Sequence, residues 1–169
     1  MILWEMRGSL QALVVVMLTL ISWRRGGGPE RATATILMAM VVVAWLYRYL
    51  SMPLLPGRVF AGYAQTDPIQ VLIDLAALVA LGAIAIRANR IYPTWMTGFQ
   101  ITATAMHFIN AIAFGQAQLA YALLNVLPFY FMIAAQACGL WNHIKNTKRR
   151  GRYPSWRSGS GPLPENRRT

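Results

Sequence analysis

The chain has 169 residues, of which 56% are hydrophobic and 12% are charged, a balance that excludes an ordinary soluble globular domain. Its formal net charge is +11, but the sixteen basic residues lie almost entirely between and after blocks of apolar residues. Basic residues in such places orient membrane spans, so the charge does not indicate nucleic-acid binding. We expect an integral membrane protein with the lipid bilayer, and no nucleic acid, as its partner.

Five apolar blocks follow one another along the chain and predict five transmembrane helices, at about residues 9–23, 32–50, 69–86, 92–114 and 119–141. The first block lacks a basic lead-in and an Ala-x-Ala site, so we interpret it as a retained span and not as a cleaved signal peptide. The predicted fold class is therefore all-α, an integral membrane bundle whose single transmembrane domain covers residues 1–144.

The connections between these blocks are polar or rich in helix breakers. Residues 24–31 contain Gly-Gly-Gly-Pro and predict a tight polar turn, whereas residues 51–68 form the longest connection, as a structured loop or a short interfacial helix. A basic elbow, Arg87-Ala-Asn-Arg90, joins the third and fourth blocks. Residues 145–169 contain basic residues, Gly, Pro and Ser, and we expect this tail to be disordered because it has too little apolar surface to fold.

Arginine and lysine placement predicts the orientation of the bundle. With five spans, thirteen basic residues lie on one side of the membrane and three on the other. The positive-inside rule then puts the N-terminus outside and the tail in the cytoplasm. Two roles stay open for the first part of the tail: it contacts anionic lipid headgroups, or it only enforces the orientation. Its basic residues are Lys145, Lys148, Arg149, Arg150 and Arg152.

Polar residues inside the predicted spans are the candidates for function. Asp74 lies roughly 8 Å inside the outer end of its helix and His107 roughly 10 Å inside its own, at 1.5 Å per residue. Asn125 falls in the same layer of the fifth span. The fourth span places further polar residues on the face that carries His107, with Asn110 one turn beyond it: Thr97, Gln100 and Thr104. We expect this intramembrane polar layer to face the interior of the bundle, because lipid offers no hydrogen-bond partner.

Two interpretations of this layer stay open. The groups can be interhelical hydrogen bonds that fix which helices pair, or Asp74 and His107 can form a proton-binding pair or line a cavity for a small solute. A haem or metal site would need a homo-oligomer, because one membrane-embedded histidine cannot supply two axial ligands and Cys138 is the chain's one cysteine. We expect no cofactor, no metal and no catalytic residue.

A local resemblance supports a bacterial setting. Residues 85–100 read Ala-Ile-Arg-Ala-Asn-Arg-Ile-Tyr-Pro-Thr-Trp-Met-Thr-Gly-Phe-Gln, with an Arg-x-x-Arg elbow before an aromatic residue, a proline and a tryptophan. This stretch resembles one in small multi-span inner-membrane proteins of alphaproteobacteria, particularly sphingomonad-type bacteria, a group without an assigned activity. The resemblance implies the inner (plasma) membrane of a bacterium and transfers no functional residue.

Several functions remain open from the sequence, and an enzyme is the least favoured. The first is a non-catalytic structural or accessory subunit of a membrane assembly, formed with other subunits or as a homo-oligomer. The second is a small proton-coupled permease or transporter that uses Asp74, His107, Gln100 and Asn125. The third is a membrane-permeabilising protein of phage type, since such proteins are small and end in a basic tail. A lipid-modifying enzyme with Asp74 and His107 as acid and base would lack a metal or a phosphate cradle.

Overall fold

The computed structural model describes residues 2–54, 68–112, 118–151, 154 and 156, and these residues form five α-helices. They are α1 (Ile2–Arg25), α2 (Gly28–Leu54), α3 (Pro68–Arg87), α4 (Tyr92–Ile112) and α5 (Gln118–Arg150). The all-α fold class predicted from the sequence is confirmed.

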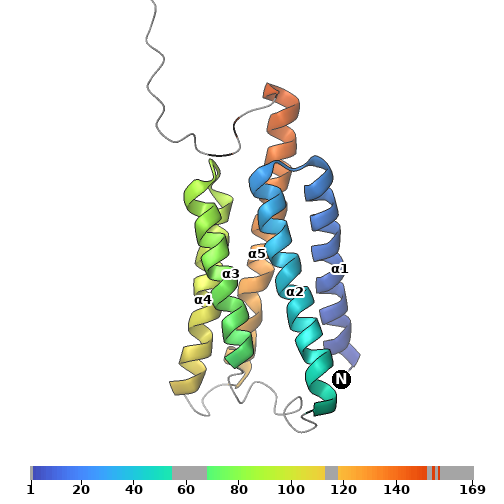
Figure 1. Ribbon diagram of the computed structural model, residues 1–169, viewed down its shortest axis with the longest axis vertical. Coiled ribbons are helices and arrows are strands. Elements are labelled where there is room, and N and C mark those ends of the chain that lie inside the picture. Colours follow the sequence, from blue (N-terminus) through green and yellow to red (C-terminus); the bar gives the residue numbers. More distant parts are fainter. Residues whose placement is uncertain (1, 55–67, 113–117, 152–153, 155, 157–169) are drawn as a thin grey trace, which may run out of the picture.

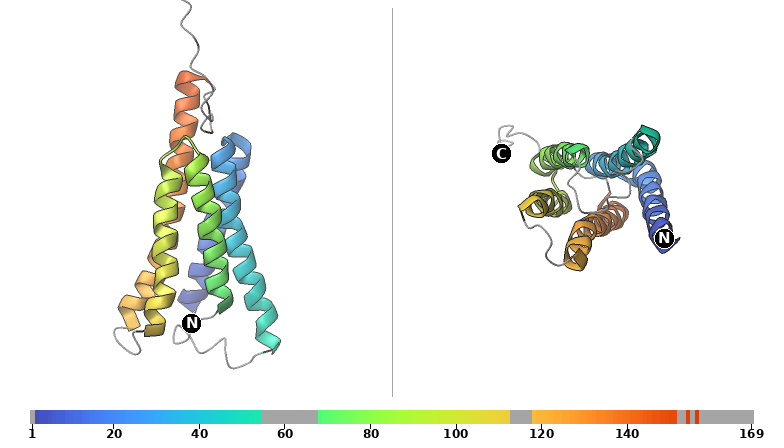
Figure 2. Two further views of the ribbon diagram at one scale, coloured as in Figure 1. Left: turned by 60° about the vertical axis from the view of Figure 1, so that its left-hand side comes forward. Right: turned by 90° about the horizontal axis from the view of Figure 1, so that it is seen from below.

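The helices stand roughly side by side, and each packs against the next along the chain (Figure 1). α5 also contacts α1 and α2, so that the five helices form a closed ring when seen from the end (Figure 2). The α1–α2 turn, the α3–α4 elbow and the C-terminal end of α5 all lie at one end of the bundle (Figure 1). We call it the basic end, because Arg24, Arg25, Arg31, Arg87, Arg90, Lys145, Lys148 and Arg149 lie there.

The turn between α1 and α2 is much shorter than the polar turn expected at residues 24–31. α1 continues through Arg25, and its end is closed by a hydrogen bond of 2.8 Å from the Gly26 amide to the Ser22 carbonyl. A side chain on Gly26 would lie 2.5 Å from that carbonyl oxygen, so glycine is needed there. α2 begins at Gly28, because proline is tolerated in the first turn of a helix and the Glu30 carboxylate favours its N-terminus.

The helices extend beyond the apolar blocks from which the spans were predicted. α1 begins at Ile2, ahead of the block at residues 9–23, and α2 runs to Leu54, beyond the block at residues 32–50. α5 continues through residues 145–150, which the sequence assigned to a disordered tail. Helix propensity and the intrahelical hydrogen bonds extend a helix beyond its apolar block, so hydrophobicity underestimates the helix length. The remainder of the connection at residues 55–67 lies outside the described residues.

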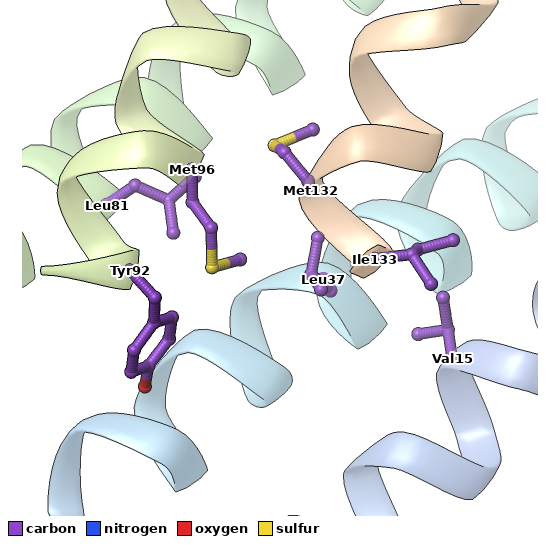
Figure 3. Close-up of a cluster of buried hydrophobic side chains, with 7 residues drawn as sticks. All are labelled: Val15, Leu37, Leu81, Tyr92, Met96, Met132 and Ile133. Carbon is purple, nitrogen blue, oxygen red and sulfur yellow. The ribbon is translucent and has the colours of Figure 1, made fainter. Parts of the chain in front are cut away.

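A small apolar core holds the ring together and takes side chains from every helix. Its fully or nearly buried members meet at the centre of the bundle (Figure 3): Val15, Leu37, Leu81, Tyr92, Met96, Met132 and Ile133. Large apolar side chains also cover the outside, and Val79, Ile86 and Trp141 are each more than 70% exposed. The bundle thus presents apolar surface on its outer face as well as in its core.

Within the part of the chain that the structure describes, two helices are long and apolar enough to cross a bilayer, at Gly28–Leu50 and Pro68–Arg87. This finding is compatible with a membrane location and does not by itself extend to the other three helices.

Beyond α5, Trp156 lies back against the basic end of the bundle. It forms an isolated antiparallel bridge with Ala88, next to the elbow, and its indole ring lies directly against Gly28. A Cβ atom at Gly28 would collide with the indole nitrogen, so this close approach depends on the glycine.

Candidate functional site: two buried polar clusters

The first polar cluster joins α3 to α4 through Asp74, Gln100 and His107. His107 Nε2 lies 2.8 Å from Asp74 Oδ2. The Gln100 amide donates to Asp74 Oδ1 at 3.0 Å and to the Asp74 backbone carbonyl at 3.1 Å. The side chains of His107 and Asp74 are 9% and 18% exposed, so the pair is largely withdrawn from the surroundings. The cluster therefore ties together two helices that are consecutive in the chain.

The spacing along α4 explains why these groups meet Asp74. Gln100 and His107 are two helical turns apart, and Thr104 lies between them on the same face. This face is buried. The Thr104 hydroxyl donates to the Gln100 carbonyl of its own helix at 2.9 Å, so its hydrogen is used within α4. Asp74 thus contacts two of the polar residues that the sequence placed on one face of the fourth span, Gln100 and His107.

The hydrogen-bonding groups of this cluster define which atoms donate and which accept. An ionised carboxylate only accepts hydrogen bonds, so His107 Nε2 carries the hydrogen when Asp74 is charged. The amide oxygen of Gln100 is buried and has no hydrogen-bond partner, which leaves one acceptor beside the pair. The side chains of Asn110 and Asn125, which the sequence placed in the same layer, lie outside the described residues.

The second polar cluster lies at the basic end and consists of Glu30, Arg90 and His143. Arg90 Nε lies 3.4 Å from Glu30 Oε1, and Arg90 Nη2 lies 3.1 Å from His143 Nδ1. His143 Nδ1 is 4.0 Å from the same Glu30 oxygen. Glu30 is completely buried, and neither of its carboxylate oxygens has a well-aligned hydrogen bond. The cluster therefore joins α2 to the elbow by an ion pair and the elbow to α5 by a hydrogen bond.

The charge state of His143 follows from its neighbours. Arginine is always protonated and only donates, so His143 Nδ1 accepts from Arg90 and the ring is neutral in this arrangement. Burial lowers the pKa of His143 below its ordinary value of 6.5, Glu30 opposes this shift and Arg90 adds to it. The net direction is downward, in agreement with the geometry.

A hydrogen-bonded network around Gln136 continues the second cluster towards the core. The Gln136 amide donates to the Ser22 hydroxyl at 3.2 Å and to the Glu30 backbone carbonyl at 3.0 Å. Its oxygen accepts from Thr33 at 2.7 Å, and the Tyr92 hydroxyl lies 3.2 Å from that of Thr33. These five residues come from four helices, so the network fixes how α1, α2, α4 and α5 sit against one another.

The sequence analysis missed this second cluster because it placed Glu30 in a solvated turn. Glu30 instead lies inside α2 and is more deeply buried than Asp74. A usable signal was present: Pro29-Glu30 is a pattern typical of a helix start, with proline and an acidic residue in the first turn.

The predicted headgroup-binding residues lie partly within the described structure. Lys145, Lys148 and Arg149 are exposed in the last turns of α5. The Arg150 side chain and all of Arg152 lie outside the described residues. Within the described part of the chain, no three His, Cys, Asp or Glu side chains are grouped so as to hold a metal ion.

The comparisons with known proteins supply no further information on either polar cluster. Comparison with known proteins finds no matching family model, no matching curated protein and no matching solved structure.

Proposed function

We propose that this chain is a five-span, non-catalytic protein of the bacterial inner membrane that serves as a structural or accessory subunit of a membrane assembly. The N-terminus lies outside and the basic tail lies in the cytoplasm. The apolar outer face of the bundle and the two helices able to cross a bilayer support the membrane placement. The resemblance of residues 85–100 to inner-membrane proteins supports the compartment.

The observation that carries the structural role is how the buried polar groups are used. Asp74, Gln100 and His107 bond α3 to α4, and the Gln136 network bonds four helices to one another. Hydrogen bonds of this kind, worth about 0.6 kcal/mol on average and about 1.7 at most, select which membrane helices pair. A side chain that is engaged in this way stabilises the bundle itself.

The test is purification from native membranes in mild detergent, followed by native mass spectrometry. We expect a homo-oligomer or a stoichiometric complex with another membrane subunit. Asp74→Asn should lower the yield and thermal stability of the protein by the modest amount that one interhelical contact contributes. Gln70→Asn, an exposed change on the same helix, is the matched control and should leave both unchanged.

A proton-coupled permease is the second candidate, and the Asp74–His107 contact favours it. Two titratable groups lie 2.8 Å apart beside an unpartnered Gln100 oxygen, an arrangement that can bind a proton together with a small polar solute. This candidate would replace the structural proposal if two results were obtained together. The protein would purify alone, and a well-folded Asp74→Asn variant would lose a pH-dependent flux that the unchanged protein shows in liposomes. Rapid loss of membrane potential on induced expression would contradict both and support a permeabilising protein.

A further inference from the structure

A groove of about 740 Å³ runs between α4 and α5, from the basic end towards the middle of the bundle. The two helices lie next to each other in the ring (Figure 2). On α5 the lining extends from Phe131 to Asn146, which at 1.5 Å per residue is about 22 Å of helix. Half a bilayer, headgroups included, is about 20–22 Å thick. The groove thus has the length of one membrane leaflet.

The part of the groove nearer the middle of the bundle is apolar. Small residues form its floor on α5, where Ala135, Cys138 and Gly139 follow one another at helical spacing. Gly139 lies against the Tyr92 ring so closely that a Cβ there would be 2.5 Å from it. The stacked rings of Phe99 and Phe131, 5.2 Å apart, line the deep end of the groove. This surface suits a flexible hydrocarbon chain.

The outer part of the groove is polar and carries a cation. The same face of α5 continues into Asn142 and Asn146, opposite Asn89 and Arg90 of the elbow. None of the described residues that line the groove is Asp or Glu. The charge of Arg90 is offset by its ion pair with Glu30. The net positive charge around this end of the groove comes from exposed residues of the basic end such as Arg87, Lys145 and Arg149.

We propose that the α4–α5 groove binds one anionic phospholipid of the bilayer, with an acyl chain against Ala135, Cys138 and Phe131 and the phosphate beside Arg90, Asn89 and Asn142. The lining of the groove changes from apolar to polar along the helix axes, which matches the orientation of a phospholipid in a leaflet. Amide and guanidinium groups donate to phosphate oxygens, and the basic surroundings select a negative headgroup. This inference rests on the membrane placement proposed above and specifies one of its lipid partners.

Cys138 provides a direct test, because it is the chain's one cysteine, is exposed and lines the groove. The protein in dodecyl maltoside is titrated with phosphatidylglycerol or with phosphatidylcholine of identical chains, and the rate of maleimide labelling is measured. We expect phosphatidylglycerol to slow the labelling several-fold at concentrations at which phosphatidylcholine does not. In the control, Cys138→Ala with Val79→Cys, the cysteine lies on the exposed face of α3 and neither lipid should protect it.

A second pair of variants tests the headgroup. Asn142→Asp adds a negative charge at the polar end of the groove and keeps the oxygen that accepts from Asn146 at 3.1 Å. It should abolish the protection by phosphatidylglycerol. Thr94→Asp adds the same charge at the same end of the bundle, on an exposed residue that does not line the groove, and should keep the protection.

Four results would overturn the inference. Three concern the protection of Cys138 from labelling: equal protection by the two lipids, no protection by either lipid, or unchanged protection in Asn142→Asp. The fourth is a labelling rate that depends on protein concentration and not on lipid, which would indicate a second copy of the chain in the groove. Extraction of the protein from native membranes by alkaline carbonate reports separately on the proposed function. A protein that stays in the membrane but shows no lipid selectivity retains the proposed function and loses this site.

Discussion

His143 is the residue whose charge state should make the stability of the bundle depend on pH. Its pKa in the folded protein lies below the ordinary value of 6.5, chiefly because of burial. At pH values well above 6.5 the ring is neutral in both the folded and unfolded states. As the pH falls below it, the unfolded chain binds a proton that the folded chain resists, so the free energy of unfolding decreases.

We therefore expect the melting temperature in detergent to fall as the pH is lowered from 7.5 to 5.5, and to fall less in His143→Gln. The chain contains only one other histidine, His107, which the variant retains. The difference in slope between the two proteins thus reports on His143 alone. Equal slopes in both proteins would show that another group carries the pH dependence.

The contrast between Asp74 and Glu30 shows what single residues reveal in advance. Asp74 could be paired with His107 from the sequence, because both lie within apolar blocks and helical rise fixes their depth. Glu30 could not be paired with Arg90 or His143 in the same way. Each of these three lies at the edge of a block, where a charged residue usually reaches solvent, and only the packing of the helix ends buries them together.

At the scale of the helix, the packing of α4 on α5 depends on Gly139. The Tyr92 ring occupies the space that a Cβ at this position would need. Tyr92 is buried and its hydroxyl lies 3.2 Å from that of Thr33, so the ring cannot move without disturbing the Gln136 network. We expect Gly139→Ala to destabilise the protein by about 1–3 kcal/mol, the usual cost of overpacking, measured by thermal or denaturant unfolding in detergent.

Gly98→Ala is the matched control for this prediction. Gly98 lies inside α4, and nothing is within 4 Å of the Cβ that alanine would add. Alanine is the better helix former by about 0.8–1 kcal/mol, so this variant should be neutral or more stable. Two glycines on adjacent helices then respond to the same substitution in opposite directions. Destabilisation of similar size in both would mean that backbone conformation, and not the Tyr92 contact, sets the cost.

The existence of each helix could be predicted from the sequence, whereas the helix ends and neighbours could not. Apolar blocks locate the helices because burial or lipid contact requires a long apolar run. The ends depend on local features such as Pro29 in a first turn, and α5 continues to Arg150 without apolar support. The contact of α5 with α1 and α2 is a property of the closed ring, and no short stretch of sequence encodes it.

For the whole molecule, the membrane placement that we propose predicts an orientation from where the ring places its charges. The α1–α2 turn, the elbow and the end of α5 bring eight basic residues with described side chains to one end, whereas Arg7 and Arg48 lie in α1 and α2 towards the opposite end (Figure 1). Because positive loops are retained in the cytoplasm, the basic end should face inward and the start of α3 outward. Two residues of the α3–α4 hairpin can report this, since Gln70 and Asn89 are both exposed and lie towards opposite ends of α3.

In a Cys138→Ala background, Gln70→Cys should react with a membrane-impermeant maleimide on intact spheroplasts, and Asn89→Cys should react only after permeabilisation. Neither substitution changes the charge of the chain, so the pattern that orients the bundle is retained in both variants. The reversed labelling pattern would show that the bundle has the opposite orientation, with the α4–α5 groove in the outer leaflet. Labelling of both cysteines on intact spheroplasts would mean that α3 does not cross the membrane, although Pro68–Arg87 is long and apolar enough to do so.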